Sequence, residues 1–185
     1  MSVPEYGVGI LGFGFMGRTH TYGLTNLPLF YSPLPFRVKH LSVCTPVPAE
    51  QETASGLGYY RRVVDDYRKL IEDPEIDVIT VSSPNRFHKE QLLAAIEAGK
   101  HIYCDKPVAA SLEDAEAVLD AMRKTGYRGK SQVVLQYRYF PATLRAKQLI
   151  DEGFLGRVFH YRGGYIHSSN INPNKPLNWK SDKSQ

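Results

Sequence analysis

Short apolar runs alternate along the chain with longer segments in which apolar residues recur every three or four positions. The first pattern is typical of buried strands and the second of amphipathic helices. Strands are predicted at 6–11, 38–45, 76–83, 101–107 and 131–137. Helices are predicted at 49–56, 66–72, 88–100, 111–123 and 141–152, with one more beginning near Phe15. The alternation predicts an α/β fold with a doubly wound parallel sheet and helices on both of its faces.

Glycine and proline residues set the expected ends of several helices. Four of them lie within 22–36, so the helix that begins near Phe15 is not expected to run cleanly through this segment. Gly99 is a stop signal for the helix before it. Ser111 is followed three residues later by Asp114, the spacing of a near-capping box, and this predicts a helix start.

The turn between the first strand and the first helix reads Gly12-x-Gly14-x-x-Gly17. Gly12 permits a tight turn, Gly14 lets a pyrophosphate approach the backbone, and Gly17 lets the helix pack closely on the strand. The competing interpretation, a loop for a nucleoside triphosphate, requires a lysine where Arg18 stands. The turn is therefore interpreted as the dinucleotide fingerprint of a Rossmann fold. Its predicted cofactor-binding residues are Gly12, Phe13, Gly14, Phe15, Met16 and Gly17.

Ligands of such sheets bind at the carboxyl ends of the strands. The segments that follow the predicted strands are 12–17, 44–48, 82–88, 105–107 and 136–138. Every candidate motif of the chain falls within these segments. The sequence thus predicts that they line one site.

The choice between NAD and NADP depends on the end of the second strand. An NAD site usually has an acidic residue there, which binds the ribose 2′-hydroxyl. This chain has no Asp or Glu between Glu5 and Glu50, and Thr45 could donate a hydrogen bond to a 2′-phosphate. No arginine follows Thr45, however. NADP is favoured on this evidence, and NAD stays open.

Three further blocks follow in order along the chain. They are "SPNRFH" at 83–88, "AGKH" at 98–101 followed by "DKP" at 105–107, and "YRYFPATLRAKQLIDEGFLGRV" at 137–158. Together with the glycine turn, they resemble the TPxxxH, AGKHVxxEKP and NxRFxPxxxxxKxxIxxGxIG blocks of the glucose-fructose oxidoreductase, inositol dehydrogenase and MocA family. Ser83, Asp105 and Gln136 depart from the usual Thr, Glu and Asn. Each departure keeps a polar side chain, so a retained pocket of altered shape is expected.

The resemblance implies hydride transfer between a nicotinamide cofactor and a CH–OH group of a sugar or cyclitol. Lys106 is the predicted catalytic residue, because an ammonium there can hydrogen-bond the substrate oxygen and stabilise developing alkoxide charge. Tyr137 and Arg138 are candidates for the substrate site. The remaining predicted cofactor-binding residues are Thr45, Ser82, Ser83, Pro84, Asn85, His88, Asp105, Lys106, Pro107 and Gln136.

The family's proton acceptor is a histidine within a later GGGxxxDxGxH block, which these residues do not contain. The predicted domains are therefore a dinucleotide-binding domain at 1–136 and, at 137–185, a linking helix with the truncated start of a second α+β domain. We expect the 185 residues to be inactive alone. The alternative is a non-catalytic nucleotide-binding or regulatory module.

The composition of the chain mainly excludes some classes of partner and site. The net charge is +4 and the pI is near 9.0, but no dense Lys/Arg cluster occurs, so no nucleic-acid partner is expected. Cys44 and Cys104 lie in apolar runs and are predicted to be buried free thiols. No metal site, membrane span or signal peptide is predicted, which favours the cytoplasm. The expected partner is a sugar or polyol substrate, with a homo-oligomer only if the second domain is complete.

Overall fold

The computed structural model describes residues 3–168 and 171–176. Contacts divide the chain into two compact units, Met1–Val134 and Leu135–Gln185. The "NWKSDKSQ" tail, where the second predicted domain ends, lies outside the described residues.

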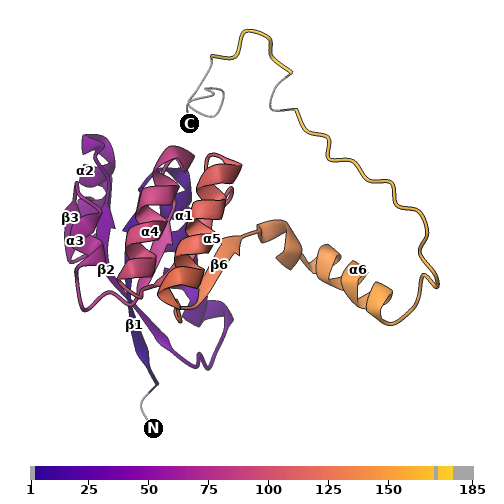
Figure 1. Cartoon of the computed structure of the whole chain (residues 1–185), viewed down its shortest axis with the longest axis horizontal. Helices are drawn as coiled ribbons and strands as arrows, with labels where there is room; N and C mark the ends of the chain where they lie inside the picture. The colour runs from indigo at the N-terminus through magenta and orange to yellow at the C-terminus, as the bar shows by residue number, and fades with distance from the viewer. Residues whose placement is uncertain (1–2, 169–170, 177–185) are drawn as a thin grey trace. The chain divides into compact units, whose positions relative to one another are not determined.

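Within the described residues, six parallel strands form the sheet of the first unit (Figure 1). They are β1 (Glu5–Leu11), β2 (Arg37–Cys44), β3 (Arg62–Val64), β4 (Val78–Val81), β5 (His101–Asp105) and β6 (Ser131–Val134). Their order across the sheet is β3-β2-β1-β4-β5-β6. The chain thus winds outward in both directions from β1, and β1 and β4 are neighbours at the point where the order reverses. The predicted doubly wound parallel sheet is confirmed.

The helices cover both faces of this sheet. They are α1 (Phe15–Phe30), α2 (Pro48–Gly56), α3 (Arg68–Ile71), α4 (His88–Glu97) and α5 (Leu112–Thr125). One apolar cluster joins α3, α4 and α5 to the sheet through residues such as Leu70, Leu92 and Val118. A second cluster joins α1 and α2 to β1 and β2, and Phe13 and Ala54 are fully buried in it. Because helices pack on both faces of the sheet, the central strands are buried on both sides. Their sequences are therefore continuous apolar runs.

The predicted start of α5 is confirmed in detail. The Ser111 side chain accepts a hydrogen bond from the Asp114 N–H, so it caps the helix. The helix ends at Gly126, whose φ of 62° places it in the left-handed region. This helix is therefore defined by local signals at both ends.

Helix α1 ends within 22–36, as expected, but Gly23 and Pro28 do not interrupt it. The helix runs through Gly23 and Pro28 as far as Phe30. Pro28 lies in the last turn, where a missing N–H removes only one intrahelical bond. The Tyr31 N–H still donates to the Leu27 carbonyl, at 2.9 Å, and closes the turn.

Several strand boundaries also differ from those predicted. The run at 76–83 contributes only Val78–Val81, and the run at 131–137 ends at Val134 because a 3₁₀ turn, η2 (Gln136–Tyr139), follows it. β3 was not predicted. It has only three residues and pairs with the end of β2, so its sequence carries too short a pattern to recognise.

The second unit contains η2 and α6 (Pro141–Asp151). Residues 157–168 form neither helix nor strand. Large apolar side chains stand exposed along this segment: Phe159 is 91% exposed and Ile166 is 96% exposed. Such exposure is expected of a segment that packs against further protein. The second α+β domain stays a prediction.

Candidate functional site

The glycine turn is fixed by contacts with the strands beside it. Gly12 has a φ of 87°, which favours glycine, and its N–H donates to the Cys44 carbonyl at 2.8 Å. A Cβ on Gly12 would lie 2.7 Å from the Ser83 nitrogen, and one on Gly17 would lie 2.1 Å from the Gly12 oxygen. Only glycine fits at these two positions. The first and third glycines of the fingerprint thus have the packing roles predicted for them.

Gly14 differs from the other two glycines. It is the N-cap of α1, and no side chain caps the helix there. A Cβ on Gly14 would meet only the Glu50 Oε1, at 3.5 Å. The space beside Gly14 is therefore open, and the first N–H groups of α1 have no side-chain acceptor. An uncapped helix start beside open backbone is a suitable site for a phosphate group.

The side chains within the turn point to different environments. Phe13 is fully buried and packs edge-on against Tyr60, with ring centroids 5.7 Å apart. Phe15 is 76% exposed, and Met16 is half-buried. Phe13 can therefore reach a ligand only through its backbone, whereas Phe15 and Met16 have side chains at the surface.

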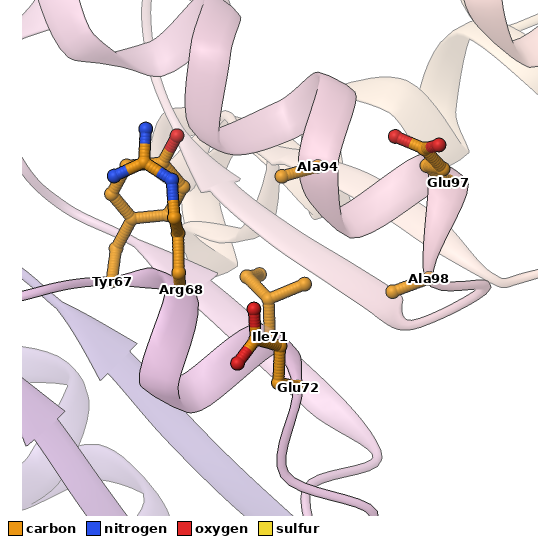
Figure 2. Close-up of a pocket in the computed structure, with 7 residues that line it drawn as sticks. All are labelled: Tyr67, Arg68, Ile71, Glu72, Ala94, Glu97 and Ala98. Carbon is orange, nitrogen blue, oxygen red and sulfur yellow. The ribbon is translucent and has the colours of Figure 1, made fainter.

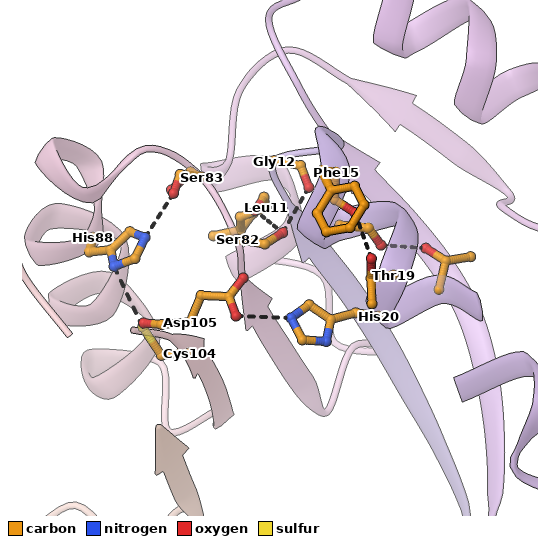
Figure 3. Close-up of polar contacts among 12 residues, drawn as sticks. Leu11, Gly12, Phe15, Thr19, His20, Ser82, Ser83, His88, Cys104 and Asp105 are labelled. Carbon is orange, nitrogen blue, oxygen red and sulfur yellow. Dashed lines mark hydrogen bonds and ion pairs between the residues drawn. The ribbon is translucent and has the colours of Figure 1, made fainter. Parts of the chain in front are cut away.

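Ser82, a predicted cofactor-binding residue, joins the end of β4 to the glycine turn. Its Oγ lies 3.0 Å from the Leu11 carbonyl and 2.9 Å from the Gly12 carbonyl, and its N–H donates to Leu11 (Figure 3). The Ser82 hydroxyl has one proton, and these two carbonyls share it. Ser82 therefore braces the turn from the neighbouring strand.

His88 connects the segments that follow β4 and β5. Its ring is 1% exposed. Nε2 lies 2.8 Å from the Ser83 carbonyl (Figure 3) and Nδ1 lies 3.0 Å from the Pro107 carbonyl. Both partners are acceptors, so the ring donates to both when it carries two protons and to one when neutral. His88 thus acts on the site by holding two loops together, since its ring nitrogens point to backbone rather than to open space.

Asp105 ends β5 and is buried. Its Oδ1 lies 3.2 Å from the Nε2 of His20, which comes from α1 and is itself buried (Figure 3). The His20 ring also packs edge-on against Tyr103 at 5.3 Å. The predicted carboxylate therefore has a partner that sequence analysis missed. His20 lies three residues beyond Gly17, one helical turn further along α1, and that spacing was the available signal.

Lys106 and Pro107 follow Asp105 and are both exposed. Ser83 donates to the Gln91 Oε1 at 2.7 Å, while Pro84 and Asn85 are half-buried at the start of the 3₁₀ turn η1 (Asn85–Phe87). The ammonium of Lys106 is thus accessible at the carboxyl end of β5, beside the loop that follows β4 in the sheet.

Gln136, Tyr137 and Arg138 belong to the second unit, in η2. All three are exposed. Tyr137 contacts Phe140 edge-on, and its hydroxyl lies 3.0 Å from that of Tyr165. Their predicted roles toward cofactor and substrate stay predictions.

The two cysteines are buried free thiols, as predicted. Burial raises the pKa of each thiol to about 12, and the charge of Asp66 on Cys44 and of Asp105 on Cys104 acts in the same direction. Both are protonated at neutral pH. They are therefore unsuited to nucleophilic chemistry.

Two other features lie apart from these residues. A groove of about 350 Å³ between α3 and α4 is lined by Tyr67, Arg68, Ile71, Glu72, Ala94, Glu97 and Ala98 (Figure 2). No predicted site residue lines it. In the described part of the chain, His, Cys, Asp and Glu side chains form no group of three that could hold a metal ion. No helix there is long and apolar enough to cross a membrane.

The strand order, the glycine turn and the uncapped start of α1 define a dinucleotide-binding domain of the Rossmann class. A family model described as "Oxidoreductase family, NAD-binding Rossmann fold" matches residues 6–131. The chain belongs to this family, which groups glucose-fructose oxidoreductase, inositol dehydrogenase and MocA. The predicted family is confirmed.

Individual relatives agree with this assignment. The levoglucosan dehydrogenase of Pseudarthrobacter phenanthrenivorans is 36% identical over 177 residues, which are 96% of this chain and 45% of that protein. An inositol 2-dehydrogenase/D-chiro-inositol 3-dehydrogenase of Lactiplantibacillus plantarum is 32% identical over 81% of this chain and 41% of its own length. A solved levoglucosan dehydrogenase in complex with NADH superposes with a TM-score of 0.91 at 35% identity, covering 97% of this chain and 48% of that one. The chain thus spans less than half the length of these relatives.

Proposed function

We propose that these residues form the cofactor-binding part of an oxidoreductase. Its reaction would transfer hydride between NAD or NADP and a CH–OH carbon of a sugar or cyclitol. The single observation that carries the proposal is the glycine turn with open space at Gly14, between two glycines that the packing requires. The relatives named levoglucosan and inositol dehydrogenases support the substrate class.

The residues present fit a dinucleotide. The pyrophosphate would lie over Gly14, where no side chain caps α1 and the nearest atom to a Cβ is 3.5 Å away. Backbone N–H groups and the positive end of the helix would then stabilise its charge. The nicotinamide supplies the hydride acceptor when the cofactor is bound. Ser82 and His88 hold the turn and the loops around it in place.

Lys106 is the proposed catalytic residue of this part. Its exposed ammonium can donate a hydrogen bond to the substrate hydroxyl and stabilise the negative charge that develops on that oxygen. Asp105 stands next to it, held by His20 at 3.2 Å. This hydrogen bond limits the movement of the strand end that carries Lys106, so His20 and Asp105 act as a positioning device.

The proton acceptor of the reaction would come from outside these residues. The chain spans 45% of levoglucosan dehydrogenase, and the GGGxxxDxGxH block of the family is absent from it. We therefore propose that the 185 residues bind cofactor without sustained turnover. Tyr137 and Arg138 would contribute to the substrate site when the second domain is complete, and oligomer formation would depend on that domain. The two free thiols suit the reducing cytoplasm.

The test is a fluorescence titration of the chain with NADH and NADPH, in wild type and in Gly14→Val. The valine side chain would occupy the open space proposed for the pyrophosphate and should abolish binding. The fold should be kept, because the new Cβ would make only an ordinary van der Waals contact of 3.5 Å, with the Glu50 Oε1.

Gly23→Val is the matched control. It makes the same substitution on the same helix, at a position where a Cβ would meet nothing within 4 Å. It should bind cofactor like the wild type. Equal binding by Gly14→Val would show that the turn does not hold the cofactor. Binding without turnover in a polypeptide that includes the complete second domain would favour the non-catalytic alternative.

A further inference from the structure

A carboxylate lies at the end of β2, although the strand itself does not supply one. Glu50 is in the first turn of α2. Its Oε2 accepts a hydrogen bond of 2.5 Å from the Thr45 hydroxyl. Its Oε1 lies 3.5 Å from the position that a Cβ would take on Gly14. One oxygen of the carboxylate is thus held by the end of the strand, and the other is next to the glycine turn.

The position of this carboxylate is set by several bonds around Thr45. The Thr45 hydroxyl oxygen also accepts from the Val47 N–H at 3.3 Å, and the Thr45 carbonyl accepts from the Gln51 side chain at 2.7 Å. Thr45 itself is 1% exposed. Its single hydroxyl proton is used on Glu50, so it cannot also be donated to a phosphate.

An acidic residue in the first turn of a helix is common, because it interacts favourably with the helix dipole. A side chain with only that role can point into water. The Glu50 side chain instead folds back over the strand end, half-buried, with its second oxygen beside the open backbone of Gly14. The direction of the Glu50 side chain therefore indicates a ligand at the glycine turn.

We propose that Glu50 binds the adenosine ribose hydroxyls and makes the site selective for NAD over NADP. Rossmann domains usually place such a carboxylate at the end of the second strand. Here α2 supplies it, and Thr45 at the strand end positions it. A carboxylate accepts hydrogen bonds from the 2′- and 3′-hydroxyls, whereas a 2′-phosphate there would meet a like charge. The inference rests on the proposed function, because it requires a dinucleotide at the glycine turn. It also reverses the preference for NADP that was expected when no acidic residue was found at the strand end.

Arg18, a cation at the same turn, does not explain a preference between NAD and NADP. The Arg18 side chain lies at the same turn, with its Nε 3.4 Å from the Gly14 carbonyl. It is exposed and next to the site proposed for the pyrophosphate, which both cofactors carry. Arg18 should therefore strengthen the binding of NAD and NADP alike.

The experiment measures the dissociation constants of NADH and NADPH for the wild-type chain and for Glu50→Gln. The wild type should bind NADH at least about tenfold more tightly, the effect of one hydrogen bond to a charged group. The amide removes the charge while keeping the shape, so NADH binding should weaken and NADPH binding should strengthen. Glu52→Gln, an exposed change of the same charge on the same helix, should leave the ratio unaltered.

A second variant tests the same idea without changing Glu50. Thr45→Val removes the hydroxyl that holds the carboxylate but keeps its shape, and it should shift the ratio in the same direction. An NADPH/NADH ratio that is the same in wild type, Glu50→Gln and Thr45→Val would overturn the role of Glu50 while leaving the proposed function standing. Failure of the wild-type chain to bind either cofactor would overturn the proposed function itself, and this inference with it.

Discussion

At the scale of single residues, the three glycines of the turn have different consequences when they are changed. Gly17→Ala places a methyl group 2.1 Å from a backbone oxygen, which cannot move away as a side chain can. We expect a loss of about 1–3 kcal/mol or more in the free energy of unfolding, the range for forced overpacking. Urea denaturation followed by circular dichroism measures it.

Gly23→Ala is the control for that measurement. Its position on α1 is open, and alanine is the better helix former by about 1 kcal/mol. It should therefore leave stability unchanged or raise it. A Gly17→Ala chain as stable as wild type would mean that helix and strand are not packed as closely as the structure has them.

Sequence analysis predicted a site at the positions after the strands, because parallel strands end at one edge of the sheet. It did not predict the contacts that the individual residues make. His88, however, is a buried connection between Ser83 and Pro107, which no pattern of types or spacing specifies. Glu50 and His20 were missed because their partners, Thr45 and Asp105, are set by the tertiary fold.

At the scale of elements, Lys100 connects the end of α4 to the loop before β4. Its Nζ donates to the Asp73 carbonyl at 2.8 Å and to the Ile76 carbonyl at 2.7 Å. Lys100 lies in the "AGKH" block that carried part of the family resemblance. This part of the resemblance therefore reflects how the sheet is assembled, and no direct contact with a ligand is needed to explain it.

Lys100→Met should lower the free energy of unfolding at pH 7 by about 1–2 kcal/mol, because two carbonyls lose their donor. Burial lowers the pKa of Lys100 from its ordinary value of 10.5. The folded protein thus binds fewer protons than the unfolded chain in the interval between the lowered pKa and 10.5. Stability from this group therefore rises with pH across that interval, and the difference between wild type and variant should widen.

Denaturation at several alkaline pH values, with Lys124→Met as the matched exposed control, measures that difference. Lys124 is on the surface of α5. A difference between wild type and Lys100→Met that stays constant or narrows with rising pH would contradict the assigned environment of Lys100.

Element boundaries were the least accurate part of the sequence prediction, for identifiable reasons. Pro28 is tolerated because it falls in the last turn of α1, and its distance from the helix end was not known beforehand. β3 has three residues and exists through its pairing with Ser42–Cys44. Local sequence signals were sufficient to predict α5, because it has both a side-chain cap and a terminal glycine.

At the scale of the whole molecule, the 185 residues should bind cofactor and show no sustained turnover. General-base assistance typically contributes about 10²–10⁴-fold, and the substrate-orienting wall of a second domain would be absent as well. The measurement supplies NAD and NADP with a panel of inositols, polyols and aldoses and follows absorbance at the reduced nicotinamide band.

Sustained turnover that disappears in Lys106→Ala and persists in the exposed-lysine control Lys124→Ala would contradict this expectation. It would mean that the residues present already contain a proton acceptor. The parallel order of the strands followed from the alternation of elements alone. The site at their carboxyl ends and the second α+β domain stay predictions.

The glycine turn is held by bonds within the protein, because the Gly12 N–H donates to the Cys44 carbonyl and the Ser82 hydroxyl donates to the Gly12 carbonyl. Its conformational entropy is therefore lost when the chain folds and not when a dinucleotide arrives. Association then requires no slow rearrangement of the loop, and encounter and orientation are left to limit its rate. The affinities of different dinucleotides for this turn should consequently be distinguished mainly by how fast each one leaves.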